Sequence, residues 1–70
     1  MAMIEDQISL SISDNDKDVA YVYLPGHQGK GVFGATPKQI RLSDILSYKG
    51  PDIYLDLDLD GRLVGIEILA

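Results

Sequence analysis

The sequence contains no cysteine and no tryptophan, and only 7% of its residues are aromatic. The absence of cysteine excludes a disulfide scaffold and a cysteine-ligated zinc module. Basic residues are scarce too: six Lys and Arg stand against eleven Asp and Glu, which gives a formal net charge of −5 at pH 7. Because such a field repels phosphates, we do not expect a nucleic-acid binder that works by general phosphate attraction.

Long apolar runs are also missing. No stretch reaches the roughly 18 consecutive apolar residues of a membrane-spanning helix, and the acidic residues 1–6 lack the form of a secretory signal peptide. We therefore expect a cytoplasmic protein that does not bind a membrane. A chain of 70 residues has room for one small domain, which we assign to residues 1–70.

Polar and apolar residues that alternate with a period of two predict an N-terminal hairpin. Residues 7–13 place aliphatic side chains on one face and serines on the other, and residues 19–24 are β-branched and aromatic. A three-residue loop at 15–17 pairs aliphatic residues across the hairpin: Ile12 with Ala20, Leu10 with Val22, and Ile8 with Leu24. Tyr21 and Tyr23 then share the serine-lined face.

The middle of the chain gives weaker signals. Residues 25–35 hold four glycines and read as a flexible loop, and residues 36–42 read as an edge strand with Pro37 near its start. A short helical turn is predicted near 43–49, with Ser43 as N-cap and Gly50 closing it. So short a helix needs docking, for which Ile45 and Leu46 are available.

The C-terminal residues predict a second hairpin. Residues 52–58 alternate strictly, and Asp60-Gly61 is a strong signal for a two-residue type I′ turn. Closing the turn there pairs the following residues: Leu59 with Arg62, Leu57 with Val64, Leu55 with Ile66, and Ile53 with Ile68. A slip of one residue would move every apolar row into water, so pattern and turn support the same register.

These elements predict a mainly β fold, a single antiparallel sheet of about five strands built from two hairpins, an edge strand and one helical turn. Its aliphatic residues gather on one face: Ile8, Leu10, Ile12, Ala20, Val22, Leu24, Ile40, Leu42, Ile53, Leu55, Leu57, Val64, Ile66 and Ile68. A bare face of this size is unusual for a monomer. The short helix, coiling of the sheet into a half-barrel, or a homodimer could cover it, and we favour the homodimer.

The run from Asp56 to Leu69, DLDLDGRLVGIEIL, resembles the C-terminal signature of a family of small bacterial proteins, the domain of unknown function twenty-two eighty-three. The segment from Asp18 to Leu24 is similar to the second strand of that family's N-terminal hairpin. The resemblance covers both hairpins, whereas residues 25–35 and 43–50 fit it poorly. It implies no catalytic residues, and it suggests an antitoxin-like or accessory role by analogy only.

The acidic hairpin also matches the spacing of a calcium loop. Asp56, Asp58 and Asp60 precede Gly61, and Glu67 occupies the twelfth position. An EF-hand loop needs a helix on each side, but here the flanking residues alternate as strands. We therefore interpret these carboxylates as a solvated face of the hairpin and expect no metal or cofactor.

The remaining candidates are a histidine and three tyrosines. His27, the only histidine, lies in the glycine-rich loop, where we expect solvent exposure; catalysis would need it to converge with Asp44 or Asp52. The loop does not match a phosphate-binding Walker sequence, because Gly31 follows Lys30. Tyr21, Tyr23 and Tyr54 lie on the polar face, where aromatic residues stabilise a sheet by cross-strand packing or form a protein-binding patch.

Nothing in the sequence specifies a reaction, so we predict a non-enzymatic protein-interaction module. It would form a homodimer and could bind a basic protein, as an antitoxin does. The candidate interaction surface comprises Tyr21, Tyr23, His27, Tyr54, Asp56, Asp58 and Glu67. The alternative is a small-ligand or cation-binding protein that uses the glycine-rich loop or the acidic hairpin.

Overall fold

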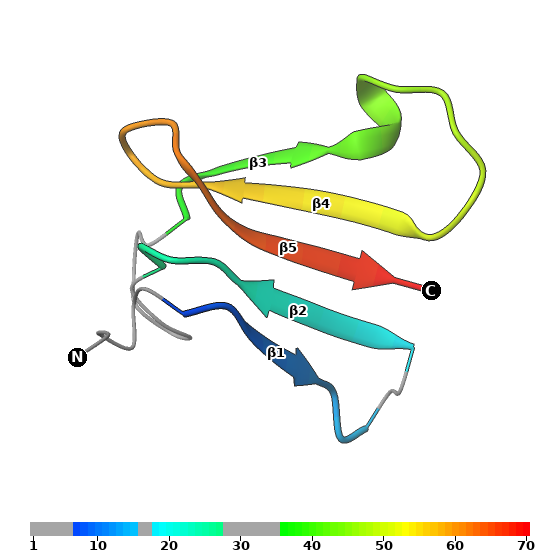
Figure 1. Ribbon diagram of the computed structural model, residues 1–70. Helices are drawn as coiled ribbons and strands as arrows, with labels where there is room; N and C mark the ends of the chain where they lie inside the picture. Colours follow the sequence, from blue (N-terminus) through cyan, green and yellow to red (C-terminus); the bar gives the residue numbers. More distant parts are fainter. Residues whose placement is uncertain (1–6, 16–17, 28–35) are drawn as a thin grey trace.

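The computed structural model describes residues 7–15, 18–27 and 36–70. These residues form one antiparallel five-stranded sheet in the order β1-β2-β5-β4-β3 (Figure 1). The strands are β1 (Ser9–Ile12), β2 (Val19–Tyr23), β3 (Lys38–Arg41), β4 (Asp52–Leu57) and β5 (Leu63–Leu69), and the 3₁₀ turn η2 (Leu42–Asp44) follows β3. The predicted fold class, a mainly β protein with a single antiparallel sheet, is confirmed.

The two hairpins join through their inner strands. Strand β2 pairs with β5, with Val22 opposite Ile66 and Ala20 opposite Ile68. This pairing makes β5, the last strand in sequence, the centre of the sheet, and leaves β1 and β3 at the edges (Figure 1). The contact between the two hairpins therefore joins residues from the N-terminal and C-terminal parts of the chain.

The N-terminal hairpin has the predicted register, with Ile12 opposite Ala20 and Leu10 opposite Val22. The first strand is shorter than predicted, because β1 begins at Ser9 and Ile8 lies outside the ladder. Leu24 does not pair with Ile8: its N–H donates to the Val64 carbonyl, 2.9 Å away, so β5 takes its hydrogen bond. Residues 16 and 17 of the predicted loop lie outside the described residues.

The inner pairs of the C-terminal hairpin are also as predicted, with Ile53 opposite Ile68 and Leu55 opposite Ile66. Near the turn the prediction was wrong. Leu57 pairs with Leu63, and Val64 is an extra residue in a β-bulge beside Gly65. A bulge shifts the register by one residue, so the alternation of the sequence alone could not place it.

The turn itself is longer than a type I′ turn. The Asp58 N–H donates to the Arg62 carbonyl, and the Gly61 N–H donates to the Asp58 carbonyl, which leaves Leu59, Asp60 and Gly61 in the loop. A type I′ turn needs positive φ at both central residues, but only Gly61 has it here, at 83°. The predicted Leu59–Arg62 pair is therefore replaced by Asp58–Arg62.

The middle segment confirms the edge strand and corrects the helical turn. Strand β3 pairs with β4 at one edge of the sheet. The helical turn is one 3₁₀ turn that begins at Leu42, so Ser43 lies inside the turn and is not its N-cap. Ile45 and Leu46 do not dock on the sheet, because their side chains remain exposed. Residues 28–35 of the predicted loop lie outside the described part of the chain.

The sheet has two very different faces and almost no interior. Among the described residues, Val64 is the only hydrophobic residue that is fully buried, at 1% exposure. The predicted aliphatic face exists, but neither η2 nor a second layer of described residues covers it (Figure 1). No helix in the described ranges is long and apolar enough to cross a membrane.

Candidate interaction surfaces

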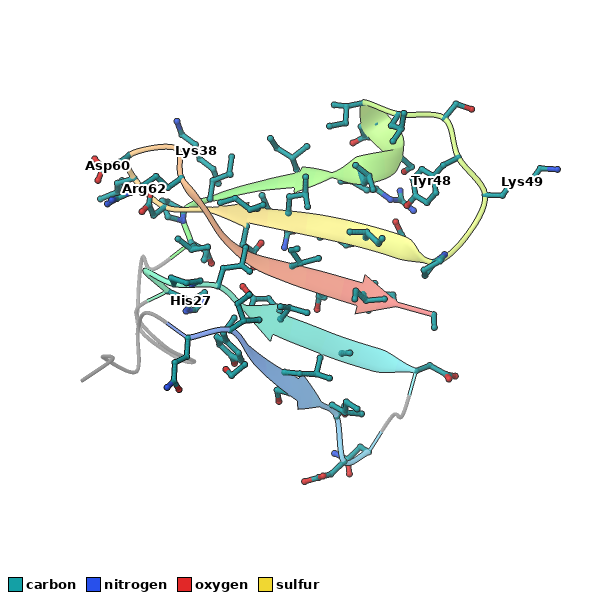
Figure 2. The ribbon with its side chains drawn as sticks, viewed as in Figure 1. His27, Lys38, Tyr48, Lys49, Asp60 and Arg62 are labelled. Atoms are coloured by element: carbon teal, nitrogen blue, oxygen red, sulfur yellow. The ribbon has the colours of Figure 1, made fainter. Side chains whose placement is uncertain are left out.

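A hydrogen-bonded cluster lies on the polar face toward one end of the strands, and we call it the tyrosine–aspartate cluster. It consists of Tyr21, Tyr23, His27, Gln39, Asp56 and Gly65. Period-two alternation turns Tyr21 and Tyr23 of β2, Gln39 of β3, Asp56 of β4 and Gly65 of β5 to this one face. His27 follows β2 and approaches from the end of the sheet where Figure 2 also places Lys38, Asp60 and Arg62.

The Tyr21 side chain crosses the central strand to reach Asp56. Its hydroxyl donates to Asp56 Oδ2 over 2.6 Å, although β5 lies between β2 and β4. The phenol passes directly over Gly65, where the Cβ of any larger residue would overlap the Tyr21 hydroxyl and lie 2.5 Å from Cζ. Glycine is therefore required at position 65 because the Tyr21 phenol approaches the backbone closely. The backbone conformation does not impose it, because the φ of Gly65 is not in the positive region.

Asp56 is the anchor of the cluster. It is 6% exposed and the only buried charged residue among those described, so the prediction of a solvated carboxylate is wrong for Asp56. Both of its carboxylate oxygens accept hydrogen bonds, Oδ2 from Tyr21 and Oδ1 from Gln39 Nε2 over 2.9 Å. A buried carboxylate is tolerated only when such donors compensate its lost hydration. The cluster thus ties β2 and β3 to β4 across the sheet.

The Tyr21 hydroxyl also determines the proton position on His27. The hydroxyl has a single proton, and it donates this proton to Asp56. In the 3.1 Å contact between the Tyr21 hydroxyl and His27 Nε2, the histidine must therefore be the donor. The His27 ring packs edge-on against Tyr23, with centroids 4.9 Å apart. Burial, followed by the hydrogen bond to Asp56, raises the pKa of the Tyr21 phenol well above its ordinary value. The phenol therefore stays protonated at neutral pH.

Tyr54 and Glu67 form the next row of the polar face. Glu67 lies between Tyr21 and Tyr54 in the register of the three central strands. The Arg41 guanidinium lies 5.7 Å from the centre of the Tyr54 ring and pairs with Asp52 through two hydrogen bonds of 3.0 and 2.8 Å. These hydrogen bonds hold the pKa of Asp52 below its ordinary value.

Asp58 belongs to the hairpin turn and not to the polar face. Its Oδ1 accepts the backbone N–H groups of Asp60 and Arg62, each over 2.9 Å. These backbone hydrogen bonds, with the one from Arg62 the largest cause, lower the pKa of Asp58. The Arg62 side chain then bridges Asp58 and Asp60. Asp58 therefore stabilises the longer loop that replaced the predicted type I′ turn.

The residues that match the spacing of a calcium loop do not converge. Asp56 is turned into the tyrosine–aspartate cluster, Glu67 lies in the neighbouring row, and Asp58 and Asp60 are engaged by Arg62 in the turn. No group of three or more potential metal ligands occurs in the ranges 7–15, 18–27 and 36–70. A calcium-dependent melting shift remains the direct test of the cation-binding alternative.

Of the seven predicted surface residues, the structure brings four together. Tyr21, Tyr23, His27 and Asp56 belong to one cluster, Tyr54 and Glu67 lie beside it, and Asp58 is in the turn. Asp52, one of the two aspartates considered with His27 for catalysis, is held instead by Arg41. Sequence reasoning missed Gln39 and Gly65. A glycine inside a strand signals close approach of another group, and this signal could have identified Gly65.

The aliphatic face is the second candidate surface. One row of aliphatic residues crosses all five strands in register: Leu10, Val22, Ile66, Leu55 and Ile40. A second row contains Ile12, Ala20, Ile68 and Ile53. On the edge strand β1, Leu10 is 62% exposed and Ile12 is 51% exposed. This face is wide, continuous and aliphatic, as the inner face of a β-sandwich is.

Comparison with known proteins gives one match. The family described as "Protein of unknown function (DUF2283)" matches residues 14–70, which include the second strand of the N-terminal hairpin and the whole C-terminal hairpin. Searches of curated proteins and of solved structures gave no match. The match covers far more than half of the chain and agrees with the resemblance of the C-terminal signature. The chain therefore belongs to this family of proteins of unknown function.

Proposed function

We propose that the protein is a non-enzymatic protein-interaction module whose binding surface is the aliphatic face of the sheet. The observation that carries this proposal is the row from Leu10 to Ile40, which spans all five strands without a covering layer of described residues. Contiguous exposed apolar patches beyond a few hundred Å² generally mark contact surfaces. Another protein surface is the natural cover for a face of this shape.

The polar face supports a function without catalysis. The Tyr21 hydroxyl and both Asp56 oxygens are engaged within the cluster, and no described side-chain polar atom that is buried lacks a hydrogen-bond partner. A catalytic base or nucleophile needs a polar group that is directed at a substrate. The cluster instead directs its polar groups at one another, which suits a structural role.

The net charge of the chain suggests that a further partner would be a basic protein. With a formal charge of −5, the module would attract basic proteins and repel acidic ones. An antitoxin-like or accessory role, in which an acidic module binds a basic protein, fits this charge. Copurification of a basic protein whose binding weakens as salt increases would support this part of the proposal, because salt screens such attraction.

Site-specific photo-crosslinking tests the proposed binding surface in cells. A photoreactive amino acid is placed at position 10, on the aliphatic face, and in a matched variant at position 11, on the opposite face of the same exposed strand. We expect a defined protein adduct from position 10 and none from position 11. Equal crosslinking from both positions, or none from position 10, would contradict the proposal.

A further inference from the structure

We infer that the partner on the aliphatic face is a second copy of this chain, packed face to face in a two-fold symmetric dimer. This inference rests on the proposed function, because it names the protein that covers the surface proposed there. Four observations carry it: the continuity of the face, the distribution of charge, the topology of the sheet, and the scarcity of buried hydrophobic residues among those described.

The continuity of the face fits a dimer interface. Its first aliphatic row crosses all five strands, and its second row crosses four of them. Obligate dimers bury continuous aliphatic surface of this kind, much as a domain buries its core.

The distribution of charge fits a partner with the same surface. The only charged side chain that the described strands place on the aliphatic face is Lys38, at a corner of the sheet (Figure 2). The carboxylates of Asp52, Asp56 and Glu67 lie on the opposite face. Two copies can therefore meet through uncharged aliphatic rows while the carboxylates of these strands point outward, so no two carboxylates are buried against each other in the contact. A face whose one charged side chain among the described strands is a lysine gives no basis for selecting a basic partner.

The topology fits two-fold symmetry. In a symmetric dimer the same patch serves both copies, and here the aliphatic rows extend to both sides of the central strand β5. Ile66 is the middle residue of the row that runs from Leu10 to Ile40. A two-fold axis near Ile66 would stack the two sheets about 10 Å apart, as in a β-sandwich.

The described residues of the single chain do not form the interior that a domain of this size needs. Val64 is its only fully buried hydrophobic residue within the described ranges. Small domains without disulfides or metals often reach stability by oligomerisation. A second copy would convert both aliphatic rows into a core, which is how obligate dimers bury apolar surface.

The test uses two double variants of the exposed edge strand. L10K/I12K adds two lysines to the aliphatic face, and S9K/S11K adds two to the polar face, so strand, net charge and residue type are matched. Size-exclusion chromatography with light scattering, and sedimentation equilibrium, give the mass and the dissociation constant. Circular dichroism confirms that each variant retains its sheet. If L10K/I12K does not fold, L10K alone is compared with S11K.

We expect the natural chain and S9K/S11K to have twice the mass of the 7.7 kDa chain at micromolar concentration. L10K/I12K should raise the dissociation constant of the dimer at least about 100-fold, because each aliphatic side chain removed from the interface is lost from both copies. A natural chain that is monomeric up to about 1 mM, or equal dissociation of both double variants, would overturn the inference.

The crosslinking experiment separates failure of this inference from failure of the proposed function. If the purified chain is monomeric but position 10 crosslinks to a different protein in cells, the second copy is wrong and the interaction module stands. If position 10 crosslinks to no protein and the chain is monomeric, both fail. If the chain is a monomer and the photoreactive group at position 10 reacts only within its own chain, the same chain covers the aliphatic face. This result would also overturn both the dimer and the interaction module.

Discussion

On one face of the sheet, the Tyr21 phenol crosses Gly65 to reach Asp56, and both Asp56 oxygens accept hydrogen bonds from side chains of neighbouring strands. On the other face, a row of aliphatic side chains of similar extent meets no covering layer of described residues. Hydrogen bonds are short and directional, so polar side chains of different strands can bond to one another on the same face of a sheet. Apolar burial requires a second layer, which one sheet cannot supply to itself.

The contrast between the faces predicts that substitutions in the polar cluster destabilise the chain itself, whereas substitutions on the aliphatic face act on its association. Four substitutions test this division, from the most destabilising to the least. Each is measured as a free energy of unfolding by denaturant titration, at protein concentrations where the chain is monomeric, so that association does not contribute.

Gly65→Ala should have the largest effect, a loss of about 2 to 3 kcal/mol in the free energy of unfolding. The added methyl group would overlap the Tyr21 hydroxyl, so the phenol must leave Asp56 or the strand must move. In a Tyr21→Ala background the same substitution should be nearly neutral or slightly stabilising, because the clash is gone and alanine suits a strand better than glycine. Equal losses in both backgrounds would show that Tyr21 does not impose the glycine.

Asp56→Ala should cost about 2 kcal/mol, because it leaves the Tyr21 hydroxyl and the Gln39 amide without their acceptor in a buried place. Asp60→Ala is the matched control: it removes a carboxylate from the exposed turn, and we expect a change of about 0.5 kcal/mol or less. Similar losses for the two variants would mean that the cluster does not stabilise the sheet.

Tyr21→Phe should cost about 1.5 kcal/mol, the low end of the range for a hydrogen bond to a charged group, and should also change the pH dependence of stability. Folding raises the pKa of the Tyr21 phenol, so its stabilising contribution is complete below the ordinary phenol pKa of about 10. Above about pH 10 the unfolded chain loses this proton and the folded chain retains it, so stability falls as pH rises.

The measurement for Tyr21 is a series of denaturant titrations between neutral pH and about pH 11. The natural chain and Tyr23→Phe should both lose stability at the alkaline end of the series. Tyr21→Phe should lose less over the same range, because the group whose pKa is shifted has been removed. Parallel curves for Tyr21→Phe and the natural chain would exclude Tyr21 as the source of the alkaline loss.

Leu10→Ser should have the smallest effect on the single chain, about 0.5 kcal/mol or less, since Leu10 is 62% exposed on an edge strand. At concentrations where the chain associates, the same variant should become clearly less stable than the natural chain, because stability then includes the interface. A large loss at low concentration would show that the aliphatic face is already buried within one chain, and would break the contrast between the two faces.

The local pairing of each hairpin could be predicted because it depends on alternation over a few residues. Leu10 opposite Val22 and Leu55 opposite Ile66 both follow from the pattern of the sequence, and both are observed. The details near the C-terminal turn could not be predicted in this way. The Asp60-Gly61 pair favours a two-residue turn, but the Asp58 side chain captures two backbone N–H groups and stabilises a longer loop.

The sequence predicted which residues share the face of the candidate site, but it did not predict which of them touch. Alternation placed Tyr21, Tyr23 and Asp56 on one face, which the structure confirms. Contact between Tyr21 and Asp56 depends on which strand lies between them, and β5 separates their strands. The pairing of β2 with β5 joins residues from opposite ends of the chain, and no local pattern specifies it.

The sequence by itself determined which residues form strands, which face of each strand is aliphatic, and how each hairpin is paired away from its turn. These properties are local, because side chains alternate across a strand and a slip exposes whole rows to water. Only the tertiary structure decided the strand order, the bulge at Val64 and the passage of Tyr21 over Gly65. These features depend on how segments that are distant in the sequence pair and pack against one another.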